Sequence, residues 1–133
     1  MRILMVDDDV SCRTCLTKLL QAHLGSTIEI SVAGDLGEAF RLLSGVGGEV
    51  DVILCDGHFP VGTAVVGWQV QQKPWLPLWA FARPKPFALL TGDPIAALEA
   101  RGYGIPAFLK PFKIEAILEF LAAAFPTKVG WPS

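Results

Sequence analysis

The sequence has few cysteines, no long apolar run and no segment that resembles a targeting signal. Its three cysteines are too few, and odd in number, for a disulfide framework. The most apolar stretch, residues 74–90, contains four prolines, an arginine and a lysine. It therefore falls short of the roughly 18 apolar residues of a membrane-spanning helix. The first residues, MRILMVDDD, become acidic too early for the apolar part of a signal peptide. We expect a soluble protein of the cytoplasm that has no membrane partner.

Positive charge is also scarce. The formal net charge is −2, which excludes the broad positive field of most nucleic-acid binders, so no direct nucleic-acid partner is expected. Apolar residues make up 52% of the chain and charged residues 18%, a composition that excludes intrinsic disorder. A length of 133 residues suits one compact domain. We expect that domain over residues 1–125, followed by a C-terminal tail over residues 126–133 that is too short for an output domain.

Cys12 and Cys15 form a C-x-x-C sequence at the start of a predicted helix that follows a predicted strand. Zinc binding is disfavoured because no second pair of ligands has a suitable spacing. A redox pair would suit a thioredoxin-like domain, but the order of the predicted elements does not match that fold. We favour a simpler interpretation, in which both are small buried or half-buried residues one helical turn apart.

Short apolar runs alternate with longer segments of helical periodicity along most of the chain. The runs predict five strands, at residues 2–6, 27–32, 50–55, 87–90 and 107–109. The periodic segments predict helices at residues 10–24, 36–43, 94–101 and 114–125. Strands that alternate with helices form a parallel sheet covered by helices on both faces. The predicted fold class is α/β, a doubly wound five-stranded parallel sheet of the (βα)5 type.

The region expected to hold the third helix is atypical because it is rich in tryptophan and proline. Residues 67–72 have a helical pattern, but the segment KPWLPLWAFARPKPF that follows has prolines at positions 74, 77, 84 and 86. Proline lacks a backbone N–H, so a continuous helix through all four positions is excluded. Trp68, Trp75 and Trp79 either pack in the core or form an apolar surface for a partner, and we favour packing.

Polar and charged side chains stand where four of the predicted strands end. The first strand is followed by residues 7–9, all aspartate, and the third by Asp56; Thr91 follows the fourth strand and Lys110 the fifth. In an open parallel sheet the carboxyl ends of the strands form the crevice in which ligands bind. We therefore expect these side chains to meet at one edge of the sheet.

Carboxylates a few ångströms apart repel by several kcal/mol at an effective dielectric constant near 20. A cation among them removes that repulsion, and oxygen ligands with open positions suit Mg²⁺. A carboxylate beside Mg²⁺, with a hydroxyl and an ammonium nearby, is equipped to accept a phosphoryl group. Asp56 is then the nucleophile, Lys110 neutralises charge on the phosphoryl oxygens, and Thr91 hydrogen-bonds one of them.

Four motifs in the expected order resemble the receiver domain of bacterial response regulators, a CheY-like family with a flavodoxin-like fold. ILMVDDD resembles the family's first strand with its acidic pair, and DVILCDGHFP its phosphoacceptor strand and following turn. ALLTG resembles the strand that carries the switch hydroxyl, and FLKPF the lysine with its following proline. The resemblance extends over essentially the whole chain.

The resemblance implies a role for each site residue. Asp7 and Asp8 would hold Mg²⁺, Asp8 directly and Asp7 through water, together with Asp56 and the backbone carbonyl of His58. Asp56 would accept the phosphoryl group, Thr91 would be the switch hydroxyl, and Lys110 would be the conserved-type lysine. The third residue of the acidic run, at position 9, is expected to cap the first helix.

The resemblance also implies a function in two-component signalling. A sensor histidine kinase or phosphotransfer protein would phosphorylate the domain, which would catalyse its own phosphorylation and dephosphorylation without being a metabolic enzyme. The added charge would switch a surface near the fourth helix and fifth strand toward a downstream protein. The sequence leaves open whether the chain forms a homodimer through its last helices.

Three features depart from the family pattern. Ala64 stands where a glycine is common, and the segment from Asp56 to Thr91 is longer than usual, with the excess in its Trp- and Pro-rich part. The switch aromatic normally lies three residues before the lysine, where this chain has Ala107, with Phe108 one residue later. A difference of one residue in a strand moves a side chain to the other face of the sheet.

Two other functions remain as alternatives. A haloacid-dehalogenase-like phosphatase also combines a nucleophilic aspartate with a hydroxyl, a lysine and Mg²⁺, but its D-x-D motif would need an aspartate where this chain has His58. A pseudo-receiver would bind partners through residues 61–86 regardless of phosphorylation. The acidic pair, acceptor, hydroxyl and lysine together favour the receiver.

Overall fold

The computed structural model describes residues 1–45, 50–57, 65–66, 69–70 and 75–125. Its main sheet has five parallel strands in the order β2-β1-β3-β6-β7. Their bounds are β1 Arg2–Val6, β2 Glu29–Ala33, β3 Val52–Asp56, β6 Phe87–Thr91 and β7 Ala107–Leu109. The helices are α1 Val10–Leu24, α2 Leu36–Ser44, α3 Trp75–Ala82, α4 Pro94–Gly102 and α5 Ile114–Ala124, with a 3-10 turn η1 at Gly25–Thr27. β4 Val65–Val66 and β5 Gln69–Val70 form a separate antiparallel pair. The predicted fold class is confirmed.

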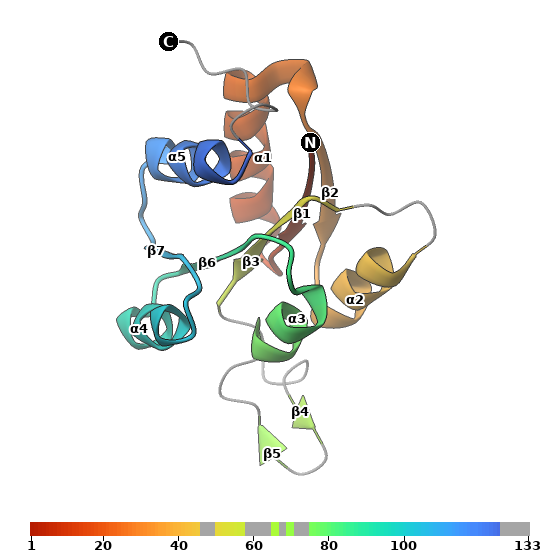
Figure 1. The fold of residues 1–133 in the computed structure, drawn as a ribbon, viewed down its shortest axis with the longest axis vertical. Helices are drawn as coiled ribbons and strands as arrows, with labels where there is room; N and C mark the ends of the chain where they lie inside the picture. The colour runs from red at the N-terminus through yellow and green to blue at the C-terminus, as the bar shows by residue number, and fades with distance from the viewer. Residues whose placement is uncertain (46–49, 58–64, 67–68, 71–74, 126–133) are drawn as a thin grey trace.

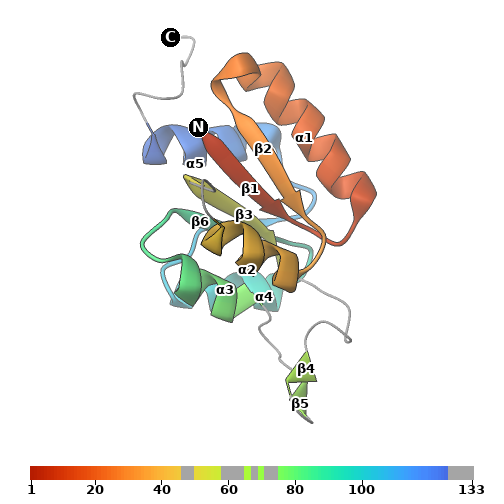
Figure 2. The ribbon, with the colours of Figure 1, turned by 90° about the vertical axis from the view of Figure 1, so that its right-hand side faces the viewer.

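The sheet divides the apolar core into two layers (Figures 1 and 2). Helices α1 and α5 cover one face, and α2, α3 and α4 cover the other. Strands β3 and β6 are buried along their whole length, as expected for central strands of a parallel sheet. Within the described residues, no helix combines the length and apolar character needed to cross a membrane.

Aspartates begin three of the helices. The side chain of Asp9 accepts hydrogen bonds from the backbone N–H groups that open α1, and Asp35 does the same for α2 and Asp93 for α4. Such caps satisfy donors that have no partner within the helix. At the other end of α1, Gly25 adopts a φ of 57°, a conformation that side-chain-bearing residues rarely adopt. These polar residues set the helix boundaries close to the predicted ones.

The third helix differs from its prediction. Residues 67–72 have a pattern that a helix could adopt, but Gln69–Val70 form the strand β5. Helix α3 instead starts at Trp75 and stops before Pro84, so the exclusion of one continuous helix through four prolines is confirmed. It does contain Pro77, its third residue. A proline is tolerated there because the first-turn N–H groups have no partner within the helix.

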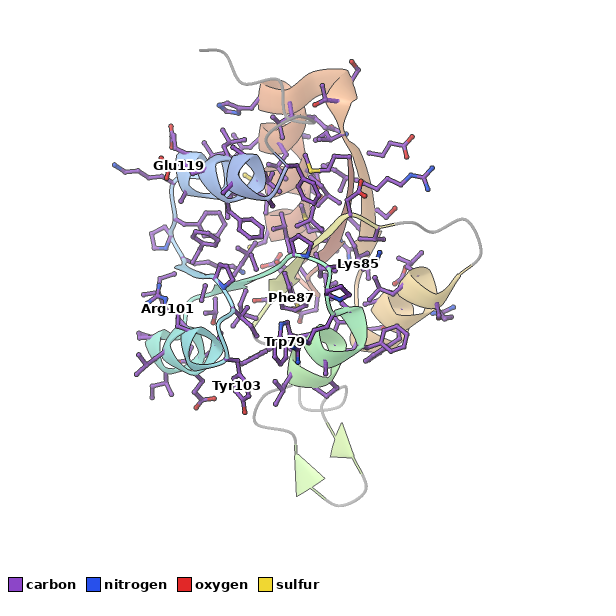
Figure 3. The ribbon with its side chains drawn as sticks, in the orientation of Figure 1. Trp79, Lys85, Phe87, Arg101, Tyr103 and Glu119 are labelled. Carbon is purple, nitrogen blue, oxygen red and sulfur yellow. The ribbon has the colours of Figure 1, made fainter. Side chains whose placement is uncertain are left out.

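Aromatic side chains pack α3 against the end of α4. Trp75 is buried at 1% exposure, and its ring meets that of Tyr103, at the end of α4, edge-on at 6.1 Å. Trp79 also packs against Tyr103, at 5.7 Å, and the guanidinium of Arg83 lies 4.9 Å from the centre of the Trp79 ring. Figure 3 shows Trp79 and Tyr103 together between the two helices. The expected packing of Trp75 and Trp79 within the domain is confirmed, and Trp68 lies outside the described residues.

Candidate functional site

The polar residues predicted at the strand ends do meet in space. They surround a pocket of about 500 Å³ at the carboxyl edge of the main sheet. The pocket is lined by Asp8, Asp9, Asp56, Thr91, Gly92, Asp93 and Lys110. Four strands supply these residues or the turns that carry them, so the pocket depends on the whole sheet rather than on one local segment.

Three carboxylates converge beside the pocket. Asp7, Asp8 and Asp56 each offer an oxygen atom, and these atoms all lie within 4.8 Å of one another. Asp7 and Asp56 are buried, at 7% and 8% exposure, whereas Asp8 is exposed. Like charges so close repel by a few kcal/mol at an effective dielectric constant near 20. A divalent cation with a preference for oxygen, such as Mg²⁺, fits this set of donors.

Lys110 provides the positive charge of the site. Its Nζ lies 3.4 Å from Oδ1 of Asp56 and 3.6 Å from Oδ2 of Asp7. Burial acts to lower the pKa of Lys110, but the charges of Asp56 and Asp7 outweigh it and raise the pKa above its usual value. Its backbone N–H donates to the carbonyl of Thr91 at 2.8 Å, which ties the turn after β7 to the end of β6. The ammonium is therefore held between two carboxylates as a permanent cation.

Thr91 is fully buried at the end of β6, on the wall of the pocket. Its Oγ1 accepts a hydrogen bond from the backbone N–H of Asp93 at 3.0 Å. The hydroxyl proton remains able to donate to a group placed in the pocket. A buried hydroxyl oriented by the turn that follows it is suited to recognising an anionic oxygen.

Asp9 does not belong to the carboxylate cluster. Its Oδ1 accepts from the backbone N–H groups of Ser11 and Cys12, at 2.9 and 3.2 Å, which confirms its predicted capping role. Those hydrogen bonds, led by that from the Cys12 backbone, lower the pKa of Asp9. Its own N–H donates to Oδ1 of Asp7 at 2.9 Å and so helps to orient that carboxylate. This contact could not be predicted from the sequence, because nothing in the run of aspartates indicates how the backbone turns.

The comparisons with known proteins agree with this arrangement at the level of fold. The chain resembles the response regulatory domain of mrkE from Klebsiella pneumoniae with a TM-score of 0.71 and 21% identity, over 96% of this chain and 98% of that one. It resembles a receiver domain from Clostridium thermocellum with a TM-score of 0.73 and 20% identity, over 96% and 95%. This chain has the receiver-domain fold. No protein-family model and no curated protein sequence matches it.

A third solved receiver is also similar in fold. TrrA from Thermotoga maritima, solved in complex with Mg(2+)-BeF, resembles this chain with a TM-score of 0.70 and 21% identity, over 92% of this chain and 97% of that one. Of the six predicted site residues, all but His58 lie among the residues that the structure describes. Residue 58 and Ala64 lie outside the described residues.

The receiver fold places Phe108 on the opposite side of the sheet from Thr91. Phe108 packs with the α1–α5 layer, where its ring meets that of Phe120 at 6.1 Å. Ala107 packs in the other layer together with Leu89. Side chains alternate along a strand, so Thr91, two residues after Leu89, lies on the side of Ala107. The expectation that the one-residue offset places Phe108 on the other face of the sheet is therefore confirmed.

The three cysteines have different environments. Cys12 and Cys15 are exposed free thiols, so the interpretation that they are buried or half-buried is wrong. Both line a pocket together with Leu90 and Phe112, and Cys12 donates from Sγ to Oδ2 of Asp9 at 3.4 Å. This hydrogen bond raises the pKa of Cys12. Cys55 is buried next to the phosphoacceptor candidate, and burial raises the pKa of its thiol well above the usual value.

We expect a thiol reagent such as Ellman's reagent to modify two of the three cysteines of the folded protein, Cys12 and Cys15. Cys55 should react after denaturation, because a fully buried thiol is neither accessible nor ionised. The count of released thiolate before and after addition of guanidinium checks this. A Cys55→Ala variant should release no additional thiolate after guanidinium is added. Reaction of Cys55 in the folded wild-type protein would contradict its buried position.

Proposed function

We propose that this protein is a phosphorylation-dependent switch, a response-regulator receiver that accepts a phosphoryl group on Asp56. The observation that carries the proposal is the position of the Lys110 ammonium, 3.4 Å from Asp56 and 3.6 Å from Asp7, beside a third carboxylate. A surface capping aspartate would need neither a buried carboxylate partner nor a shared lysine. A nucleophile for phosphoryl transfer needs both kinds of neighbour.

The carboxylate cluster supports Mg²⁺ as the metal that this reaction needs. Asp7, Asp8 and Asp56 would hold it, with the backbone carbonyl of His58 as a further ligand by resemblance to the family. When bound, Mg²⁺ supplies positive charge that offsets the charge of the phosphoryl oxygens. Lys110 adds a second positive charge from the protein itself.

Asp56 acts as the nucleophile in this proposal. A carboxylate oxygen of Asp56 attacks the phosphorus atom, the bond from phosphorus to the donor breaks, and the donor leaves with the electron pair. The product is an acyl phosphate on Asp56. The Thr91 hydroxyl donates a hydrogen bond to one phosphoryl oxygen and Lys110 pairs with another. Attack by water returns the free carboxylate and inorganic phosphate, so the switch resets itself.

The proposed donor is a sensor histidine kinase or a phosphotransfer protein, and the proposed target is a downstream protein. Helix α4 and strand β7 offer an apolar surface for such a target. Ile95 and Leu98 are 67% and 69% exposed on α4, and Leu109 is 38% exposed on β7. Helix α4 follows β6, which ends at Thr91, and Lys110 directly follows β7, so a shift at either residue reaches this surface through the backbone.

Treatment with acetyl phosphate and Mg²⁺ should add a single phosphoryl group to the wild-type protein, as measured by intact-protein mass spectrometry. Asp56→Asn should abolish the addition, because an amide is not a nucleophile toward phosphorus. Asp51→Asn is a matched control: Asp51 lies just before β3, at the far end from the site, and an asparagine can still accept from the N–H of Arg2. Full labelling of Asp56→Asn would overturn the proposal, whereas steady turnover of a phosphomonoester would favour the phosphatase.

A further inference from the structure

The residue directly after the proposed acceptor, Gly57, lies against the side chain of Thr91. A Cβ atom built on Gly57 would lie 2.8 Å from Cβ of Thr91, 3.0 Å from its Oγ1 and 3.3 Å from Cδ2 of Leu89. Contacts under 3.0 Å do not occur between real Cβ atoms and their neighbours, so any side chain here would force Thr91 away. The absence of a side chain at this position is what lets the hydroxyl approach the acceptor strand so closely.

The backbone conformation of Gly57 does not itself require glycine. In the described part of the chain the glycines with positive φ are Gly25 and Gly104, so residue 57 adopts a conformation open to any amino acid. A side chain at position 57 is therefore excluded by a steric clash with Thr91 and not by the backbone conformation.

Neither side of this contact can easily yield. Thr91 is fully buried and β-branched, and its Oγ1 is held by the N–H of Asp93 at 3.0 Å. The N–H of Gly57 donates to the carbonyl of Leu90 at 3.0 Å, which fixes the spacing between the two strand ends. An added methyl group must therefore displace the Thr91 side chain by about 0.6 Å, the difference between 2.8 Å and the 3.4 Å at which ordinary contact begins.

We propose that Gly57 is a positioning residue for phosphoryl recognition, which acts by admitting Thr91 to the wall of the pocket. The inference rests on the proposed function, because it assigns a purpose to the location of the Thr91 hydroxyl. Misplacement of a group by about 1 Å costs on the order of 100-fold in a reaction. A displacement of roughly half that size should weaken recognition by on the order of 10-fold.

The test is titration of Gly57→Ala with beryllofluoride, a mimic of the phosphoryl group, in the presence of Mg²⁺. We expect the affinity for the mimic to fall on the order of 10-fold and the affinity for Mg²⁺ alone to stay within about twofold, because the three atoms nearest to a Cβ at residue 57 belong to Thr91 and Leu89 and not to the carboxylates. In a Thr91→Ala background the same substitution should change the affinity by less than about twofold, since the hydroxyl is already absent. Gly102→Ala is the matched control, because a Cβ there meets nothing within 4 Å.

Wild-type affinity for the mimic in Gly57→Ala would overturn the inference, as would an undiminished loss in the Thr91→Ala background. Failure of the proposed function looks different, because the wild-type protein itself would then not bind the mimic. If Gly57→Ala melts too low for titration, Gly57→Ala/Thr91→Gly decides the question through its melting temperature. Removal of the Thr91 side chain removes the 2.8 and 3.0 Å contacts, so Gly57→Ala should lower the melting temperature less in the Thr91→Gly background than in the wild-type protein, and an equal loss in both backgrounds would refute the inference.

Discussion

Replacing Asp8 by asparagine is expected to stabilise the metal-free protein and to abolish its stabilisation by Mg²⁺. Asp8 is the exposed member of three carboxylates whose oxygen atoms lie within 4.8 Å, and the Lys110 ammonium pairs with the other two, Asp7 and Asp56. Asparagine removes one negative charge from the cluster while it keeps the shape of the side chain. The repulsion relieved at this exposed position is about 1 kcal/mol, which corresponds to a rise in melting temperature of roughly 3–6 °C.

Magnesium should stabilise the wild-type protein much more than the Asp8→Asn variant. A ligand at 100 times its dissociation constant stabilises the state that binds it by about 2.7 kcal/mol, so the wild-type melting temperature should rise clearly on addition of Mg²⁺. The Asp8→Asn variant lacks a proposed direct ligand and should show little rise.

Differential scanning calorimetry in EDTA and in Mg²⁺ measures both effects. Asp51→Asn changes the net charge by the same amount, away from the pocket, and should behave like the wild type in both conditions. A lower melting temperature of Asp8→Asn in EDTA would contradict the repulsion argument. An unchanged response of this variant to Mg²⁺ would remove Asp8 from the metal site.

Trp75→Ala is expected to reduce the free energy of unfolding by about 3–5 kcal/mol, the usual cost of deleting a large buried aromatic side chain. Trp75 is 1% exposed, contacts Tyr103 edge-on at 6.1 Å and lies in the core layer formed by α2, α3 and α4. Its removal leaves a cavity that α3 cannot collapse to fill, because Leu78 and Ala82 on the same helix are also buried in that layer.

Urea denaturation followed by circular dichroism measures the loss. Phe81→Ala is the matched control from the same helix: Phe81 is 52% exposed, so its removal should cost about 1 kcal/mol or less. A cost for Trp75→Ala no greater than that of Phe81→Ala would mean that α3 is not an integral part of the core.

Most of the sheet and four of the helices could be predicted because apolar periodicity and capping aspartates carry that information locally. α1 and β7 have the predicted bounds, and β2 starts two residues late because η1 occupies Gly25–Thr27. α3 could not be located from periodicity alone, because the tryptophans that bury it are interrupted by prolines. Its position follows from packing against α4, through contacts with Tyr103 that no local pattern contains.

The site was predictable for a different reason: polar groups at the ends of buried strands are conspicuous, and a parallel sheet brings such ends to one edge. Asp7, Asp8, Asp56, Thr91 and Lys110 all lie where this argument puts them. The importance of Gly57 could not be foreseen, since the closeness of β3 to β6 is a property of the assembled strands. The exposure of Cys12 and Cys15 was likewise decided by how α1 is rotated on the sheet.

Thr91 and Phe108 lie on opposite faces of the sheet, so the two layers of the core are not equivalent. On its own side of the sheet Thr91 shares a layer with Ala107, and that layer holds the rings of Trp75 and Trp79, which contact Tyr103 between α3 and α4. The ring of Phe108 packs against that of Phe120 on the other face of the sheet. In the proposed switch, a displacement of Thr91 would therefore act first on the layer formed by α2, α3 and α4, and the sheet would separate it from the layer formed by α1 and α5.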